Sequence, residues 1–221
     1  MQTPSSPDVT WPIILPLIGN PTSAIDFGCG TGHWLVGLQR LLPELKILGL
    51  NAPERKDAGV LLSAEQFQFA DLTKPADLGR KFDLAICIEL AEHLPASAAD
   101  TIINSIVKHT DVVLFSGAIP GQGGTDHLNE QWPDYWTRRF AERGFQCFDV
   151  LRPIIWMNPG ISLWYRQNIM LFMREPRAPK IKGDDWRGTP LVHPDYFRAV
   201  SSPRQRSLLN LARFIFRRPL V

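Results

Sequence analysis

The sequence predicts an α/β fold, in which a mostly parallel, doubly wound sheet carries helices on both faces. Short apolar runs alternate with stretches of helical apolar spacing along the chain. The run at residues 24–28 ends in a glycine turn, and the helical pattern at 34–42 follows at once. The run at 82–88 is almost wholly apolar, which is typical of a parallel strand buried on both faces.

The other elements follow from the same patterns and from their boundary residues. Pro43 ends the first helix, Pro53 suits the first turn of the next, and Gly144 closes the last. The final two apolar runs are joined by a long loop without a clear helix. We expect strands at residues 24–28, 46–50, 66–70, 82–88, 111–116, 145–151 and 163–174, and helices at 34–42, 53–62, 96–109 and 131–143.

Composition and cysteine usage indicate a globular protein of a reducing compartment. At 221 residues and 44% hydrophobic content, the chain can form one α/β domain with a core, plus a tail. Its three cysteines are an odd number without C-x-x-C spacing, so we expect no disulfide framework and a cytoplasmic location. The apolar run at 11–18 contains Pro12 and Pro16 and has no basic leader, which argues against a signal peptide.

Charge divides the chain into three parts. We expect an N-terminal cap segment at 1–22, of which the polar residues 1–10 are mobile, a main domain at 23–176, and a basic arm at 177–221. The arm carries ten Lys and Arg against three Asp and Glu, whereas the remainder carries 14 against 19. A mildly acidic body is not the surface that binds duplex nucleic acid.

The arm ends in a basic amphipathic helix at 202–218, where leucines and phenylalanines alternate with arginines. Three roles stay open for this helix: docking on the domain, a homo-oligomer contact, or peripheral binding to the inner face of an anionic membrane. Docking or an oligomer contact is the simpler interpretation.

The glycine turn indicates the type of ligand. Gly28, Gly30 and Gly32 let the backbone turn sharply and approach a ligand closely. The dinucleotide fingerprint G-x-G-x-x-G would require a third glycine at His33, which argues against NAD. Asp26 would repel a pyrophosphate but suits a cationic ligand.

This stretch resembles motif I of the class I S-adenosylmethionine-dependent methyltransferases, (D/E)-x-G-x-G-x-G. Asp26, Gly28, Gly30 and Gly32 match it fully, with Cys29 inside the turn. The resemblance implies S-adenosyl-L-methionine as cofactor. It also implies a seven-stranded, mostly parallel Rossmann-like sheet that ends in an antiparallel hairpin.

Two further cofactor contacts follow from the resemblance. In the family, an acid after the second strand binds the ribose hydroxyls, but this chain has Asn51, whose amide offers less than a carboxylate. Glu54 is a candidate substitute. Asp71 and Leu72 match the family's acid and apolar pair at the adenine. The alternatives are that Asn51 caps a helix and that Asp71 is a turn residue.

The end of the apolar strand at 82–88 carries a second informative motif. Ile88 and Glu89 should pass the methionine side of the cofactor. The pattern E-x-x-E-H at 89–93, with a later H-x-x-E-x-W, resembles the small-RNA terminal 2′-O-methyltransferases, in which two Glu and two His hold a divalent ion. Some ubiquinone-pathway O-methyltransferases carry a similar E-x-x-E-H. The implied ligands of Mg²⁺, Mn²⁺ or Zn²⁺ are Glu89, Glu92, His93 and His127.

A metal-free alternative stays open, because E-x-x-E-H also occurs in family members without a metal. His127 or His93 is then the candidate general base, and a structural role remains open for either.

Aromatic, amide and guanidinium side chains indicate the acceptor. Such groups suit a polar ring such as a sugar, through stacking and hydrogen bonds, although core packing is the alternative for the tryptophans. The segments around His127 and Tyr165, with 191–195, resemble bacterial methyltransferases associated with cell-surface glycan synthesis. The candidate acceptor residues are Trp132, Trp136, Tyr165, Arg166 and Asn168.

The sequence therefore predicts an O-methyltransferase that acts on a sugar, a glycan or a similar hydroxylated small molecule. A nitrogen or phenol acceptor is the first alternative. A cofactor-binding module without turnover is the second, and Asn51 is its main support.

Overall fold

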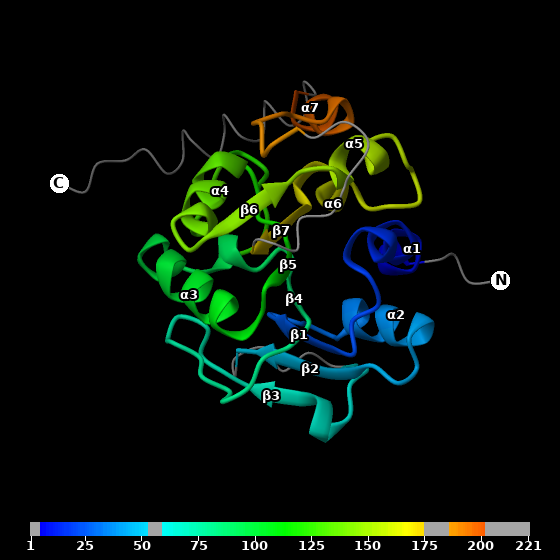
Figure 1. Ribbon diagram of the computed structural model, residues 1–221. Helices are drawn as coiled ribbons and strands as arrows, with labels where there is room; N and C mark the ends of the chain where they lie inside the picture. Colours follow the sequence, from blue (N-terminus) through cyan, green and yellow to red (C-terminus); the bar gives the residue numbers. More distant parts are fainter. Residues whose placement is uncertain (1–4, 53–58, 175–185, 202–221) are drawn as a thin grey trace. The chain divides into compact units, whose positions relative to one another are not determined.

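The computed structural model describes residues 5–52, 59–174 and 186–201. The chain divides into two compact units, Met1–Pro190 and Leu191–Val221. The first unit is built around one sheet with helices on both faces (Figure 1). Among the described residues, no helix is long and apolar enough to cross a membrane.

The sheet has seven strands in the order β3-β2-β1-β4-β5-β7-β6. The pairs from β3 to β5 are parallel, whereas β7 runs antiparallel to both β5 and β6. This topology confirms the predicted mostly parallel sheet with an antiparallel terminal hairpin. The strands are β1 Ser23–Phe27, β2 Lys46–Asn51, β3 Phe67–Phe69, β4 Leu84–Cys87, β5 Val112–Phe115, β6 Phe145–Phe148 and β7 Met170–Arg174.

Each face of the sheet is covered by its own apolar core. Successive residues of a strand point to opposite faces, so Ile86 joins one core while Ala85 and Cys87 join the other. This double burial explains why the run at 82–88 is apolar without alternation. One core is closed by α1 Ser6–Ile18, α2 His33–Leu41 and α5 Leu151–Ile155, and the other by α3 Ala99–His109 and α4 Pro133–Ala141.

The prediction that residues 1–10 are mobile is wrong from Ser6 onward, because α1 begins there. Ser5 precedes the helix, and both its backbone N–H and its hydroxyl donate to the carboxylate of Asp8. Trp11 then anchors the helix. It is fully buried, and its indole N–H donates to the backbone oxygen of Trp34 over 2.9 Å.

The connection between β6 and β7 differs most from the prediction. The predicted strand 163–174 begins as a helix, α6 Leu163–Asn168, and only Met170–Arg174 is extended. The strand predicted at 145–151 ends at Phe148, and α5 follows. The polar stretch Tyr165–Asn168 was the signal for this change, because such residues do not suit a strand buried on both faces.

Two other predicted helices fall partly or wholly outside the described residues. Of the helix predicted at 53–62, residues 53–58 lie outside them, and residues 59–62 are not helical. The amphipathic helix predicted at 202–218 also lies outside them. The described part of the second unit contains α7, Pro194–Ser201. Single 3₁₀ turns occur at Ala64–Gln66, Ala91–His93 and Ala96–Ala98, labelled η1 to η3.

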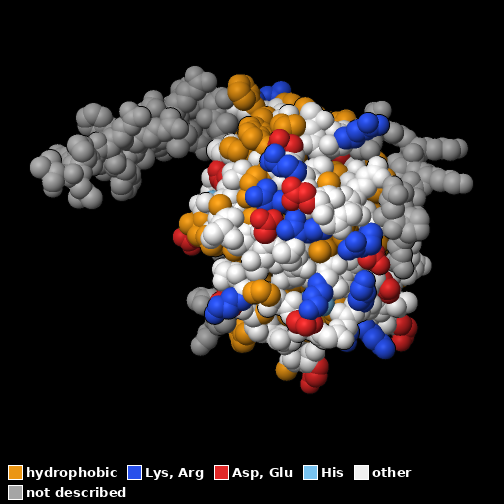
Figure 2. Space-filling model, turned by 60° about the vertical axis from the view of Figure 1, so that its left-hand side comes forward, with side chains coloured by type: hydrophobic (Ala, Val, Ile, Leu, Met, Phe, Trp, Pro, Cys, Tyr) orange, Lys and Arg blue, Asp and Glu red, His pale blue; other side chains and the backbone are white. Residues whose placement is uncertain are grey.

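Paired charges cover the face formed by α3 and α4. Asp100 lies 2.9 Å from Arg143 and 3.6 Å from Arg139, and Lys108 lies 2.7 Å from Asp77. Figure 2 shows positive and negative side chains interleaved on this side of the molecule. Opposite charges therefore compensate one another here instead of forming a uniformly basic surface.

A buried ion pair holds the connection between β6 and β7. Asp149 and Arg152 are both fully buried, and Arg152 Nε donates to Asp149 Oδ1 over 2.8 Å. Arg152 also donates to the backbone oxygens of Gln167 in α6 and Thr189. Asp149 accepts from the backbone N–H of Gly188 over 2.9 Å. One ion pair thus joins α5, α6 and the segment at 186–189.

We expect the substitution Arg152→Met to lower the free energy of unfolding by about 3–5 kcal/mol, because it leaves the Asp149 carboxylate buried without its counter-ion. Chemical denaturation measures the change. Arg40→Met is the matched control, since Arg40 pairs with Asp8 at the surface and its loss should cost less than about 1 kcal/mol. Equal losses in the two variants would contradict the prediction.

Candidate active site

The glycine turn after β1 lies at the edge of the sheet where the parallel strands end. Gly28, Gly30 and Gly32 have φ of +85°, +51° and +88°, a region that glycine occupies without strain. The backbone N–H groups of Gly28 and Cys29 both donate to the oxygen of Leu50, over 2.8 and 2.9 Å. The turn is therefore fixed to the end of β2.

Steric contacts give a second reason for two of these glycines. A Cβ atom on Gly28 would lie 2.6 Å from Leu90 Cδ1, and one on Gly32 would lie 2.6 Å from Leu62 Cγ. Sequence reasoning missed a third position, Gly49 within β2, where a Cβ would lie 2.6 Å from Cys29 Sγ. A glycine inside an otherwise apolar strand was the available signal.

Asp26 lies on β1, beneath the turn. Its side chain is 2% exposed, and within the described part of the chain its Oδ1 has no hydrogen-bond partner. Burial raises the pKa of Asp26 to about 8, so the carboxyl group stays protonated in neutral solution without a ligand. A nearby positive charge would favour its ionised form, which fits the predicted cationic ligand.

The predicted cofactor residues after β2 and β3 differ in burial and in their hydrogen bonds. Asn51 ends β2, is buried, and accepts the N–H of Ala52 through its Oδ1. Asp71 is exposed and forms a turn: hydrogen bonds from the hydroxyl and N–H of Thr73 and an ion pair with Lys74 lower its pKa to about 2. This geometry fits the turn-residue alternative for Asp71. The adenine role of Asp71 and Leu72 stays a prediction, and Glu54 lies outside the described residues.

Ile88 and Glu89 follow β4, and Glu89 is held in an unusual backbone conformation. Its φ is +49°, which is uncommon for a residue with a side chain. Ser116 stabilises it twice: its hydroxyl accepts the N–H of Glu89 and donates to Oε1 over 2.8 Å. Gln122 donates to Oε2 over 2.9 Å, and Asn168 donates to Oε1 over 3.1 Å. Three donors, two from the loop after β5 and one from α6, therefore hold this carboxylate.

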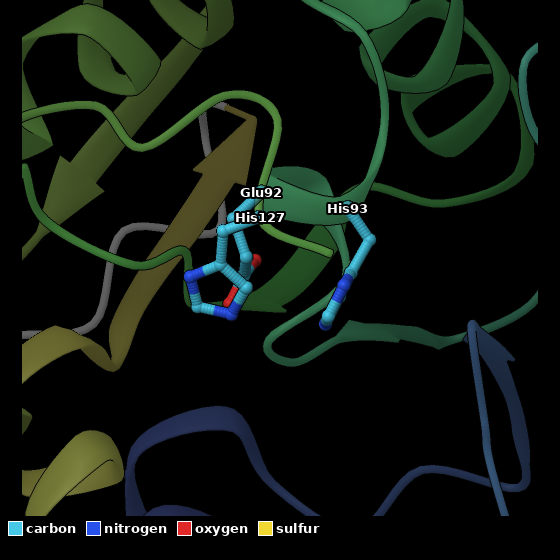
Figure 3. Close-up of side chains that lie close together, drawn as sticks. All are labelled: Glu92, His93 and His127. Carbon is cyan, nitrogen blue, oxygen red and sulfur yellow. The ribbon is translucent and has the colours of Figure 1, made fainter. Parts of the chain in front are cut away.

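Three predicted metal ligands converge beside Glu89. One ligand atom from each of Glu92, His93 and His127 lies within 4.8 Å of the other two. Figure 3 shows the three side chains directed into one space. The two imidazoles meet edge to face, with ring centroids 4.9 Å apart. Glu89, predicted as a fourth ligand, is not part of this group of three, although its carboxylate lies close enough to Glu92 to raise the pKa of that residue.

The convergence depends on backbone contacts between η2 and the loop after β5. The N–H groups of Leu128 and Asn129 both donate to the backbone oxygen of Glu92, over 2.7 and 3.0 Å. This contact places His127 against Glu92, 35 positions away in the sequence.

Glu92 has the environment of a cation ligand. Its side chain is fully buried, and no described donor reaches either carboxyl oxygen with full hydrogen-bonding geometry, although the backbone N–H of Ala118 lies close enough to lower the pKa. Burial, and then the negative charge of Glu89, raise the pKa of Glu92 to about 9. A carboxyl group that lacks donors costs free energy unless a ligand supplies the missing interaction.

A carboxylate orients His127, as often occurs for imidazoles that bind metals or transfer protons. The Nδ1 of His127 lies 2.9 Å from Glu130 Oε1, which leaves Nε2 facing the group of three. Glu130 also accepts the N–H groups of Gly121 and Gly123, each over 2.7 Å. Sequence reasoning did not list Glu130, although its H-x-x-E spacing from His127 was the signal.

Three of the predicted acceptor residues, Trp132, Tyr165 and Asn168, are exposed or lie at the sheet edge, whereas Trp136 and Arg166 are packed elsewhere. Tyr165 and Asn168 lie at the sheet edge, and Trp132 is 37% exposed at the start of α4. Trp136 is corrected to a core residue, because it is 1% exposed and packs 5.2 Å from the ring of Phe115. Arg166 is 9% exposed and donates to the backbone oxygen of Trp156 within the connection.

The strand order, the glycine turn and the acid beneath it define a class I S-adenosylmethionine-dependent methyltransferase. The chain belongs to the family described as the methyltransferase domain, whose model matches residues 12–152. No curated protein sequence matches the chain.

Solved structures share the fold at low sequence identity. The sugar N-methyltransferase KedS8 from Streptoalloteichus is 14% identical, with a TM-score of 0.59, over 78% of this chain and 88% of that one. Magnesium protoporphyrin IX methyltransferase from Synechocystis, with bound S-adenosylhomocysteine, is 19% identical, with a TM-score of 0.50, over 75% and 80%. The small RNA methyltransferase HEN1 is 18% identical, with a TM-score of 0.55, over 79% of this chain but 26% of that one.

We expect Gly28→Ala to weaken binding of S-adenosylhomocysteine and to destabilise the fold. The new methyl group collides with Leu90, which should cost about 1–3 kcal/mol in addition to the backbone strain of alanine at this φ. Calorimetry and chemical denaturation measure both effects. Gly79→Ala is the control: its φ of +64° carries similar strain, but its surroundings are open. The prediction fails if both variants bind the ligand as the wild type does.

We expect stability to fall as the pH rises from about 4 to about 8. Across this range the unfolded chain has lost the Asp26 proton, at its ordinary pKa of 3.8, while the folded chain keeps it up to about 8. Asp26→Asn should make the decrease smaller, by on the order of a few kcal/mol. Chemical denaturation across this pH range measures the effect. Asp134→Asn is the control, because Asp134 is exposed. An unchanged slope in Asp26→Asn would contradict the assignment.

Proposed function

We propose that the protein transfers a methyl group from S-adenosyl-L-methionine to a hydroxyl oxygen of a sugar, a glycan or a similar hydroxylated small molecule. The observation that carries this proposal is the convergence of Glu92, His93 and His127 beside the predicted cofactor cleft. Two imidazoles and a carboxyl group at this place can accept a proton or bind a cation. An alcohol is a poor nucleophile until its proton is removed, either by a base or with the help of a bound cation.

The reaction is a displacement in which the S–CH₃ bond breaks as the O–CH₃ bond forms. The bonding electrons stay on sulfur, the positive charge of the sulfonium is lost, and the hydroxyl proton must leave the acceptor oxygen. The residues must therefore hold the oxygen in line with the methyl group and remove that proton.

We propose that Glu92, His93 and His127 hold a divalent cation, Mg²⁺, Mn²⁺ or Zn²⁺. The donor set fits, because the buried carboxyl group of Glu92 converges with two imidazoles and His127 is oriented by Glu130. Such a cation, when bound, lowers the pKa of an acceptor hydroxyl. The protein's own contribution is to fix the ligand atoms within 4.8 Å of one another and to bury Glu92.

Without a metal, the same group supports general-base catalysis. His127 is then the candidate base, since Nδ1 faces Glu130 and Nε2 faces the group of three. The proton taken from the acceptor would pass to Nε2, and the carboxylate of Glu130 would stabilise the imidazolium.

A nitrogen acceptor is the main competing proposal. The solved structure of a sugar N-methyltransferase has the same fold, and an amine needs no metal because a neutral amine is a stronger nucleophile than a neutral hydroxyl. A phenol acceptor, or a cofactor-binding module without turnover, are further alternatives. Release of S-adenosylhomocysteine with hydroxylated acceptors, but not with their amino analogues, would favour the oxygen acceptor.

Partners other than the acceptor remain proposals. We propose that the helix predicted at 202–218 makes a homo-oligomer contact or binds peripherally to the cytoplasmic face of a membrane, on the basis of its basic amphipathic sequence. The mildly acidic remainder of the chain supports the proposal that duplex nucleic acid is not a partner.

We expect the protein to bind one divalent ion per chain, and Glu92→Gln and His127→Ala each to weaken the binding at least about tenfold, because each removes one ligand. Titration calorimetry with Mg²⁺, Mn²⁺ and Zn²⁺ measures this without a known acceptor. His33→Ala is the control, since His33 is an exposed imidazole outside the group. If no ion binds the wild type, and methyl transfer is unaffected by a chelator, the metal proposal is wrong and the general-base proposal remains.

A further inference from the structure

The connection between β6 and β7 brings a tyrosine to the cofactor side of the cleft. Because β7 runs antiparallel to β5, its first residue, Met170, pairs with Phe115 at the end of β5. The residues just before Met170 therefore lie at the edge where the parallel strands end. Helix α6 occupies this place, and Tyr165 in it packs edge to face on Trp34, with ring centroids 5.2 Å apart.

Trp34 belongs to the first turn of α2, directly after the glycine turn. It is 6% exposed, and within the described residues the nearby acceptor of its indole N–H is the Tyr165 hydroxyl, at a geometry short of a full hydrogen bond. Trp34 nevertheless lies near enough to the Tyr165 hydroxyl to lower its pKa, against a larger increase from burial. The two polar hydrogens, N–H and O–H, are thus close together in a buried place.

The start of α2 is also suited to an anion. No side chain caps this helix end, and its first turn contains no acidic residue. Backbone N–H groups at a helix N-terminus carry a partial positive charge that attracts carboxylates and phosphates. The buried indole N–H of Trp34 comes from the same turn and supplies an additional donor.

Acceptors for a positive charge lie next to these donors. Burial raises the pKa of the Tyr165 hydroxyl, and the charges that Glu89 and Asp26 carry when ionised raise it further, so both carboxyl groups lie near Tyr165. Asp26 Oδ1 and Asn168 Oδ1 are buried, and neither has a partner within the described part of the chain. Donors beside acceptors match a zwitterion, and the amino-acid end of S-adenosylmethionine carries a carboxylate and an ammonium group.

We propose that Trp34 and Tyr165 bind the carboxylate of the cofactor's amino-acid end, so that the β6–β7 connection recognises the cofactor. The inference rests on S-adenosylmethionine as the methyl donor. It assigns Tyr165 to the cofactor and not to the acceptor, and it gives Trp34 a role that its helical position alone does not suggest.

The test compares S-adenosylmethionine with decarboxylated S-adenosylmethionine, which keeps the ammonium group but lacks the carboxylate. By calorimetry, we expect Trp34→Phe and Tyr165→Phe each to weaken binding of S-adenosylmethionine about tenfold, as for loss of a hydrogen bond to a charged group. Binding of the decarboxylated compound should change less than about twofold, because the removed donors have no partner on it.

Trp164→Phe is the matched control, because Trp164 lies next to Tyr165 in the same helix but is 45% exposed. It should leave both affinities unchanged. Equal weakening of both compounds in Trp34→Phe and Tyr165→Phe would overturn the proposal, since it would indicate a general structural role. Unchanged affinity for both would overturn it as well. If the wild type binds neither compound, the methyl-donor assignment itself fails.

Discussion

Parallel strands must all end at the same edge of their sheet, and the arrangement of this protein depends on that constraint. Asp26 in β1, Asn51 at the end of β2 and Glu89 after β4 come together there although they are far apart in the sequence. The strand β7 is antiparallel to β5, so it is the beginning of β7 that lies at that edge. Helix α6 therefore lies at the same edge, where its Tyr165 packs on Trp34, directly after the glycine turn.

The same edge concentrates buried polar groups that lack partners. Burial raises the pKa of Asp26 to about 8, and burial together with the negative charge of Glu89 raises the pKa of Glu92 to about 9. Glu89, between them, is instead held by Ser116, Gln122 and Asn168. A folded protein retains such costs where a ligand offsets them, which is why these carboxyl groups support a site for cations more strongly than their sequence motif does.

Periodicity was sufficient for most of the fold. The apolar run at 82–88 predicted β4 because a strand buried on both faces has no polar position, and the glycines at 28, 30 and 32 predicted the turn. The same rule failed at 163–174, where the polar stretch Tyr165–Asn168 belongs to a short helix and only the apolar end of the segment is a strand. Trp136 was likewise ambiguous, because core packing and ligand stacking require the same kind of side chain.

By itself, the sequence determined the class of the protein, since Asp26 and the glycine spacing restrict the turn to a cationic ligand. Only the tertiary structure decided which residues meet. It joined His127 to Glu92 through backbone hydrogen bonds between a loop and η2, and it held the carboxylate of Glu89 with Ser116, Gln122 and Asn168. These contacts arise between segments that are distant in the chain, and local residue patterns contain no information about such distances.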